Sequence, residues 1–318
     1  MATSSAGQGD PASLCRVTEH MSPANDVAVP GQRLAIGGQA NSSQVTKPGH
    51  IDVSTPNVAR MYDWFLGGKD NYAADREAGA KVLTRYPGAR LAARANRAFL
   101  RWAVRHLAGS RGIRQFLDVG TGLPTQQNVH EVAQRIIPGA RTVYVDNDPV
   151  VLTHARALLS TDPRTIVIRA DVREPVRLID QVMESGHLDF RQPVALLLVA
   201  VMHFVRDDER PAEAVRTLVN ELAPGSMLVL SHLLGDVQRR EVMAAAQVYQ
   251  EANVPAIGRT RAEIKWMFDG THLVEPGLRP VGDWLMITGA VEQLEPSPDH
   301  DRTSLLRVPV LCGMGRKG

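Results

Sequence analysis

The chain has 318 residues, of which 44% are hydrophobic and 22% charged, values close to the globular average. Such a chain can bury a sizeable core, which excludes a collagen-like protein, a coiled coil and a chain disordered throughout. Its 36 basic residues nearly balance 34 acidic ones, for a formal charge of +2. Because no long block of Lys and Arg occurs, the charge pattern predicts no nucleic-acid partner.

Targeting signals are not apparent in the sequence. The start, MATSSAGQGD, has neither a basic nor an apolar segment, so we expect no signal peptide. The longest apolar run, residues 194–202, has about half the length that a membrane span needs, so no membrane partner is expected. Cys15 and Cys312 lack metal-ligand spacing and predict free thiols in a reducing compartment. We therefore predict a cytoplasmic protein.

The N-terminal part divides into a tail and a helical region. Residues 1–50 are rich in Ser, Gly, Pro, Gln and Asn, which predicts a flexible tail. The sequence STP at 54–56 predicts the start of the first helix, and the glycines at 67–68 predict its end. Two more helices are expected over 75–83 and 91–107. Together these helices predict an N-terminal helical cap over residues 51–110.

From Ile113 onward, short β-type runs alternate with helices, which is typical of a parallel sheet with helical crossovers. Strands are expected at 115–120, 142–146, 165–169, 194–201, 226–230, 273–287 and 305–314. Helices are expected at 124–137, from 149, at 207–222 and after the capping box TRAE at 260–263. We therefore expect an α/β fold over residues 111–318: a Rossmann-like sheet of seven strands, the last one antiparallel, with helices on both faces.

The first strand ends in the sequence DVGTG, with Asp118, Gly120, Thr121 and Gly122 at the turn. Glycines there let the backbone approach a ligand, and a helix N-terminus attracts an anion. The dinucleotide fingerprint requires a third glycine where Thr125 stands, and Asp118 would repel a pyrophosphate. The acidic residue instead suits a ligand that carries an ammonium group. The alternative is a tight turn needed only for packing.

Two further strands end in carboxylates: Asp146, followed by Asn147, and Asp171, followed by Val172. Open α/β sheets bind ligands in the crevice at the carboxyl ends of their strands. There, Asp146 is placed to accept the hydroxyls of a ribose, and Asp171 to accept an exocyclic amine. The alternative for each aspartate alone is a helix cap or a strand-end turn, a role we expect for Asp148.

The series DVGTG, VDND and ADV resembles the motifs of class I S-adenosylmethionine-dependent methyltransferases. The resemblance implies S-adenosyl-L-methionine as cofactor and S-adenosyl-L-homocysteine as product. It places the methionine end at Asp118 and the glycine turn, the ribose at Asp146, and the adenine near Asp171. The cofactor-binding residues expected on this basis are Asp118, Gly120, Thr121, Gly122, Asp146, Asn147, Asp171, Val172 and Ala200.

Longer segments, from PNVARMYDWFLGGKDNYAADREA to the closing GMGRK, are similar to an actinobacterial methyltransferase family, the DUF574 group. The similarity runs from about Thr55 to Lys317, and LGGKDNY is its most distinctive part. It implies a class I methyltransferase fold with a helical N-terminal cap and an antiparallel seventh strand. It does not imply a particular methyl acceptor.

The loop within LGGKDNY is polar and lies between two expected helices. We expect Gly68, Lys69, Asp70, Asn71 and Tyr72 to contact the substrate or to close over the cofactor as a lid. The alternative is a capping turn with solvated charges.

His203 follows the fourth strand, beside the expected position of the methyl group. A histidine there can take a proton from a hydroxyl acceptor, and small-molecule O-methyltransferases carry a similar one. The alternative is packing or capping alone, and a structural role is the better interpretation for His232. The D/N-P-P-Y signature of amine methylation is absent here, and no histidine pair has metal-site spacing, so no metal is predicted.

These patterns predict an S-adenosylmethionine-dependent methyltransferase that acts on a small-molecule acceptor, with O-methylation favoured. Two alternatives remain: a non-catalytic sensor or partner protein that binds the cofactor, and a nicotinamide-dependent (NAD) oxidoreductase. We expect the cap helices and residues 237–268 to form the walls of the acceptor site. The sequence makes no prediction of the oligomeric state.

Overall fold

The structure of the chain is a computed structural model that describes residues 52–318 apart from 125–126, 160–161 and 295–301. The tail predicted over residues 1–50 lies outside the described residues.

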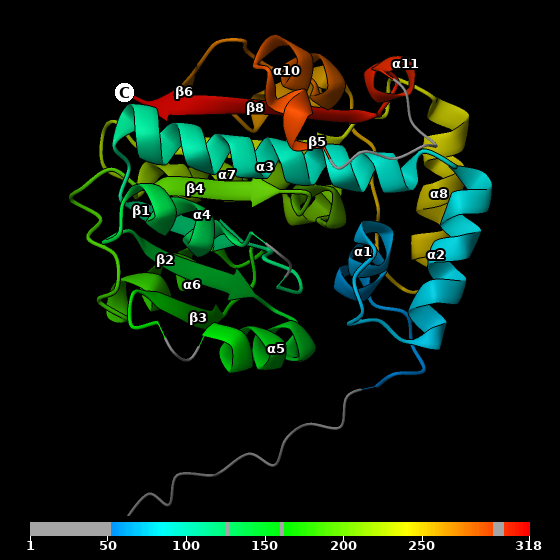
Figure 1. Ribbon diagram of the computed structural model, residues 1–318, viewed down its shortest axis with the longest axis horizontal. Coiled ribbons are helices and arrows are strands. Elements are labelled where there is room, and N and C mark those ends of the chain that lie inside the picture. Colours follow the sequence, from blue (N-terminus) through cyan, green and yellow to red (C-terminus); the bar gives the residue numbers. More distant parts are fainter. Residues whose placement is uncertain (1–51, 125–126, 160–161, 295–301) are drawn as a thin grey trace, which may run out of the picture. The chain divides into compact units, whose positions relative to one another are not determined.

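The described residues form one mixed sheet of eight strands in the order β3-β2-β1-β4-β5-β8-β6, with β7 paired to β8 (Figure 1). Its strands are β1 (Gln115–Val119), β2 (Arg141–Asp146), β3 (Thr165–Arg169), β4 (Ala195–Val199), β5 (Met227–Leu233), β6 (Thr271–Leu273), β7 (Arg279–Pro280) and β8 (Val310–Lys317). The strands β1 to β5 pair in parallel, and β8 pairs antiparallel with β5. The residues that follow the parallel strands therefore meet at one edge of the sheet.

Helices cover both faces of this sheet. In β1, Phe116 packs into one apolar cluster and Leu117 into the other, because successive strand residues point to opposite faces. The first face carries α3 (Ala89–Arg111), α4 (Val129–Ile136), α5 (Pro149–Leu159), α10 (Val281–Ile287), η3 (Ala290–Gln293) and α11 (Arg302–Leu306). The second carries α6 (Pro175–Glu184), α7 (Pro211–Asn220) and α9 (Arg261–Trp266). Both faces of the parallel strands are thus buried, which explains their continuous apolar runs.

A third apolar cluster joins α1 (Val58–Leu66) and α2 (Ala73–Arg85) to α8 (Arg239–Glu251). Figure 1 shows these helices beyond the carboxyl ends of the parallel strands. Because α8 follows β5 in the chain, two distant segments build this cap together. The division into a cap at 51–110 and a sheet domain at 111–318 stays a prediction.

The first helix begins later than predicted. It starts at Val58 rather than at 54–56, and Asn57 is the N-cap, whose side chain accepts the Arg60 N–H at 3.1 Å. Asn57 has an extended backbone, and its amide oxygen satisfies a donor that the first helical turn leaves free. The predicted end is confirmed, since Gly67 caps the helix with φ 82°.

Two other predictions need correction. The helix expected from residue 124 begins at Val129, where Asn128 and Glu131 form a capping box. The strand expected over 273–287 is wrong, because this segment forms β6, β7 and the helix α10. Consequently the sheet has eight strands rather than seven, while the antiparallel pairing of the last strand is confirmed.

Candidate active site

A cavity of about 380 Å³ lies at the carboxyl edge of the parallel strands. Every residue predicted to bind the cofactor lines it: Asp118, Gly120, Thr121, Gly122, Asp146, Asn147, Asp171, Val172 and Ala200. These residues come from four different strand ends, and the sheet order brings them together.

The glycine turn after β1 requires its glycines. Gly120 has φ 72°, and a Cβ atom there would collide with the side chain of Val201. The Gly120 N–H donates to the Val145 carbonyl at 2.8 Å, which ties the turn to β2. Gly122 also has a positive φ, of 65°, and its N–H donates to Asp146 Oδ2 at 3.0 Å. The turn therefore passes along the cavity wall with its backbone exposed to a ligand.

Asp118 is a buried carboxylate at the end of β1. Its residue is 6% exposed, and its side chain makes no hydrogen bond or ion pair within the described part of the chain. Burial raises its pKa to about 7, against a smaller lowering by Arg97 and a further rise from Asp146. A cationic ligand would stabilise the ionised form, as the sequence predicts for an ammonium group.

Asp146 is held by the backbone on both sides. Its Oδ2 accepts the Gly122 N–H, and its Oδ1 accepts the Asp148 N–H at 3.0 Å. Burial raises its pKa, and these hydrogen bonds oppose the rise. Each carboxylate oxygen retains a second lone pair. The side chain can therefore accept ribose hydroxyls without losing its own anchors.

Asp171 already has partners. It forms an ion pair with Arg173 at 2.6 Å and accepts a hydrogen bond from Asn147 Nδ2 at 2.9 Å. Burial favours its neutral form, but these contacts outweigh burial and lower its pKa to about 2. Its carboxylate orients Asn147, which lines the cavity together with Val172.

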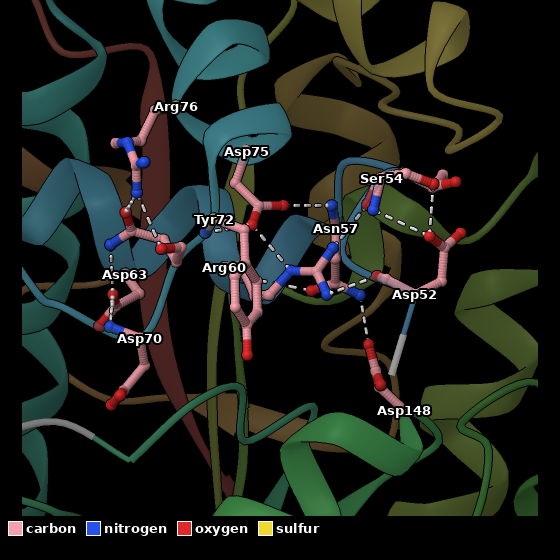
Figure 2. A network of polar contacts seen from close by, with 12 residues as sticks. Asp52, Ser54, Asn57, Arg60, Asp63, Asp70, Tyr72, Asp75, Arg76 and Asp148 are labelled. Carbon is pink, nitrogen blue, oxygen red and sulfur yellow. Dashed lines mark hydrogen bonds and ion pairs between the residues drawn. The ribbon is translucent and has the colours of Figure 1, made fainter. Parts of the chain in front are cut away.

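The N-terminus of α1 covers part of the cavity. Asn57 donates through its side chain to Asp148 Oδ2 and through its backbone N–H to Asp75 Oδ1 at 2.8 Å. Figure 2 shows Asn57 between these two aspartates, with Arg60 beside Asp75. The ion pair between Arg60 Nε and Asp75 Oδ2 spans 2.9 Å and is fully buried. This network attaches α1 to α2 on one side and to the start of α5 on the other.

The loop predicted to contact the substrate or to act as a lid, Gly68 to Tyr72, lines neither this cavity nor the smaller one described below. Asp63 Oδ2 accepts hydrogen bonds from the Asp70 N–H at 2.9 Å and from Asn71 Nδ2 at 2.8 Å. A Cβ atom at Gly68 would collide with the same carboxylate. Asp63 itself lines the large cavity, so the loop, including Lys69, reaches it only indirectly. Its substrate or lid role stays a prediction.

A smaller cavity of about 120 Å³ adjoins the first. Its walls are mostly apolar and come from α1, α2, α3 and α8 together with the ends of β4 and β5. Five residues line both cavities: Val58, Tyr62, Asn96, Ala200 and Phe204. The segment 237–268 contributes residues of α8 and Ala256 here, whereas Trp266 is exposed on the surface.

His203 lines the smaller cavity. Its Nδ1 is buried and has no hydrogen-bond partner among the described residues. Burial, with His232 and Arg259 nearby, lowers its pKa well below the usual range, so the imidazole is neutral at physiological pH. A neutral imidazole has one unprotonated ring nitrogen, and that nitrogen can accept a proton.

His232, in contrast, has its ring nitrogens satisfied. Its Nδ1–H donates to the Leu233 carbonyl at 2.8 Å, and its Nε2 accepts from Arg259 at 2.9 Å. Burial lowers its pKa to about 3. This geometry agrees with the structural role expected for His232.

The comparisons with known proteins identify the family. The model of the S-adenosyl methyltransferase family matches residues 44–318. The chain belongs to this family. No curated protein matches the sequence.

Two solved structures are similar over nearly their whole length. A DUF574-family protein from Streptomyces avermitilis is 38% identical, with a TM-score of 0.77 over 85% of this chain and 100% of the other. A putative methyltransferase from Thermobifida fusca is 39% identical, with a TM-score of 0.75 over 86% of this chain and 99% of the other. These matches confirm the resemblance that the sequence motifs indicated.

The chain is thus an S-adenosylmethionine-dependent methyltransferase with a class I fold, and S-adenosyl-L-methionine is its cofactor. The donor set suits this group, since the larger cavity presents the unpaired Asp118 and the anchored Asp146. Family membership decides against the nicotinamide-dependent oxidoreductase. In the described part of this methyltransferase, every helix is too short or too polar to cross a membrane.

Sequence reasoning missed several residues of the methyltransferase site. Asn57, Asn96 and Arg97 line the larger cavity, but none was selected from the sequence. Asn96 carried a signal, because it is a polar residue within the buried face of α3. Arg97 carried none, since it is one of many arginines on that helix.

Proposed function

We propose that this methyltransferase methylates a hydroxyl group of a small, uncharged and largely apolar acceptor that binds in the smaller cavity. The observation that carries the proposal is the adjacency of the two cavities, since Ala200, Tyr62 and Asn96 are among the residues that line both. The larger cavity accounts for the cofactor, and the smaller one for an acceptor next to it.

The lining of the smaller cavity supports an uncharged acceptor. Within the described residues, no Asp, Glu, Lys or Arg side chain lines it. Its polar groups are neutral: the phenols of Tyr62, Tyr86 and Tyr249, the amide of Asn96, the hydroxyl of Ser231, and His203. A charged acceptor would lose its hydration there without gaining a counter-ion. An aromatic or aliphatic molecule with one polar group fits this chemistry.

The bound cofactor supplies an electrophilic methyl group on a sulfonium ion. The protein's own task is to align the acceptor, to exclude water and to accept one proton. We assign the proton to the free Nδ1 of His203, which is neutral and faces no competing donor among the described residues. A hydroxyl acceptor must lose a proton on methylation, and this is why His203 favours O-methylation over methylation of a neutral amine.

Matched acceptor pairs test this proposal. Small phenols and the corresponding anilines and benzoates are incubated with the enzyme and methyl-labelled S-adenosylmethionine, and the products are identified by mass spectrometry. We expect methyl transfer to phenols, with anilines and carboxylates as poor acceptors. Methylation of the anilines alone would contradict the proposal. Cofactor binding without methylation of any acceptor would favour the sensor alternative.

The variant His203→Asn tests the base. General-base catalysis contributes about 10²- to 10⁴-fold to a rate, so we expect kcat to fall by that amount with phenolic acceptors. The affinity for S-adenosylhomocysteine, measured by calorimetry, should stay within about twofold of the wild type, because His203 does not line the larger cavity. A kcat near that of the wild type would exclude His203 as the base.

A further inference from the structure

Two charged side chains of opposite sign line the larger cavity and form no ion pair with any described residue. Asp118 comes from the end of β1, and Arg97 comes from α3. Within the described residues, the Arg97 guanidinium makes one hydrogen bond, from Nη2 to the Gln127 carbonyl at 3.3 Å, and its buried Nε has no partner. Arg97 lies near enough to lower the pKa of Asp118, yet the two form no ion pair.

The other charged side chains of this cavity are already engaged. Arg173 pairs with Asp171 at 2.6 Å and with Glu209 at 3.2 Å. The remaining carboxylates accept hydrogen bonds from the chain itself: Asp63, Asp146 and Asp148. Among the described residues that line the cavity, Arg97 and Asp118 are therefore the charges left for a ligand.

We infer that Arg97 binds the α-carboxylate of the cofactor's amino-acid end while Asp118 takes its ammonium group. The two charged groups of an amino acid are attached to one carbon atom, so they require a cation and an anion in the same small space. A guanidinium offers several donors in a planar fork that suits a carboxylate. A buried donor without a partner, such as Arg97 Nε, is costly until a ligand satisfies it.

A simpler role for Arg97 predicts a different result. If its charge served only to keep Asp118 ionised, its removal would weaken binding of the ammonium group. Every ligand with that group would then lose affinity equally, whether or not it carries a carboxylate. If Arg97 binds the carboxylate, only ligands that have one lose affinity.

The experiment compares two ligands on two proteins by calorimetric titration. The ligands are S-adenosylhomocysteine and its decarboxylated analogue, which keeps the amine. We expect the wild type to prefer S-adenosylhomocysteine by about 10- to 100-fold, the range for a hydrogen bond to a charged group. In Arg97→Gln this preference should fall to about twofold or less, with the analogue bound about as tightly as by the wild type. A preference in Arg97→Gln equal to that of the wild type would overturn the inference, as would equal losses for both ligands.

Two further variants keep the result interpretable. Arg105→Gln removes another guanidinium of α3, one that donates to Gln127 Oε1 at 3.2 Å. Because Arg105 does not line the cavity, this variant should prefer S-adenosylhomocysteine as strongly as the wild type does. Arg97→Met keeps the aliphatic stem and removes the charge, and it must repeat the loss of preference. Thermal unfolding without ligand confirms that each variant is folded. The test uses no acceptor, so its outcome is independent of the proposed O-methylation.

Discussion

The Oγ of Ser231 donates a hydrogen bond to Oδ1 of Asn96 at 2.5 Å, and both side chains are buried. Ser231 Oγ also accepts the Ala200 N–H at 3.0 Å, and Asn96 Nδ2 donates to the Tyr62 hydroxyl at 3.1 Å. Ala200 has φ 58°, a conformation that non-glycine residues rarely adopt. This chain of contacts fixes Ala200 and Tyr62 where the two cavities meet.

The variant Ser231→Ala should therefore lose both stability and turnover. It leaves the buried Asn96 Oδ1 without a donor, which costs about 1–3 kcal/mol of the free energy of unfolding. It also removes the shorter of the two hydrogen bonds from the Ala200 N–H and leaves only the one to the Ser231 carbonyl at 3.4 Å, so kcat should fall by about tenfold or more. Urea unfolding and steady-state kinetics measure the two effects.

Ser226→Ala is the matched control for this prediction. Ser226 is equally buried, and its Oγ accepts the Val194 N–H at 3.0 Å, but it precedes β5 at the end opposite the site. It should lose stability with kcat unchanged. Equal kcat values in the two variants would show that the Ser231 contact does not position Ala200.

Replacing Asp118 by Asn should raise the free energy of unfolding at high pH and weaken cofactor binding. Its pKa of about 7 in the folded protein lies above the ordinary value of 3.8, so the folded state holds the proton more tightly than the unfolded state. The free wild type should lose stability as pH rises from about 4 to about 7. Asp118→Asn lacks this loss and should be more stable at about pH 8, by up to about 4 kcal/mol. Thermal unfolding at several pH values measures the difference.

The same variant should bind the cofactor poorly, because an amide cannot pair with an ammonium group as a carboxylate does. We expect at least about a tenfold weaker affinity for S-adenosylhomocysteine at neutral pH. In the wild type, this affinity should decrease below about pH 7 as Asp118 takes up its proton. Parallel stability-against-pH curves for the two proteins would refute the assignment of this pKa.

The hydrogen bond from Asn57 to Asp148 should control release of the cofactor, because both residues line the larger cavity and join α1 to α5. Asn57→Ser keeps a helix cap but is too short to reach Asp148, and Asn57→Ala loses both functions. Both variants should release S-adenosylhomocysteine about tenfold faster, as measured by stopped-flow displacement. Only Asn57→Ala should also lose about 1 kcal/mol of stability from the missing cap. Release rates like the wild type would mean that α1 does not retain the ligand.

The buried ion pair of Arg60 and Asp75 should be the most sensitive contact of the cap. The two side chains are 2% and 0% exposed, so Asp75→Asn leaves an uncompensated buried charge, which typically costs about 3–5 kcal/mol. Limited proteolysis should cleave the segment around α1 and α2 faster in this variant. The exposed pair Arg177–Glu174 is the control, since Glu174→Gln should cost less than about 1 kcal/mol. Equal protease resistance of the two variants would contradict the prediction.

Local signals in the sequence predicted the sheet and its strand-end residues well. The strand at 165–169 has the predicted bounds, and the capping box at Thr260 and Glu263 starts α9 as expected. The apolar pattern over 273–287 led to the wrong prediction of a strand. Val281, Trp284 and Leu285 are buried at helical spacing in α10, but so short a segment does not distinguish a strand from a helix by its pattern. The start of α1 was ambiguous because two capping residues, Thr55 and Asn57, flank Pro56.

The larger cavity was predictable because parallel strands bring consecutive strand ends to one edge, so that short motifs identify the residues that line it. The smaller cavity was not predictable in the same way. Its walls join Val82 of α2 to Ala245 and Tyr249 of α8, and no local pattern indicates that helices so far apart in the chain pack together. Arg97 could not be identified from the sequence for a similar reason. It matters because it lines the larger cavity without an ion pair to any described residue, and its neighbours in sequence do not indicate this.

The helices α2 and α8 line only the smaller cavity, whereas the glycine turn and its aspartates line only the larger one. Substitutions on α2 and α8 can therefore reshape one chamber while the donor-binding chamber keeps its form. On the proposed assignment of the two cavities, a change on these helices would alter the acceptor and leave the methyl donor the same. Exchanging these two helices as a unit between relatives is thus a direct route to enzymes with altered substrate range.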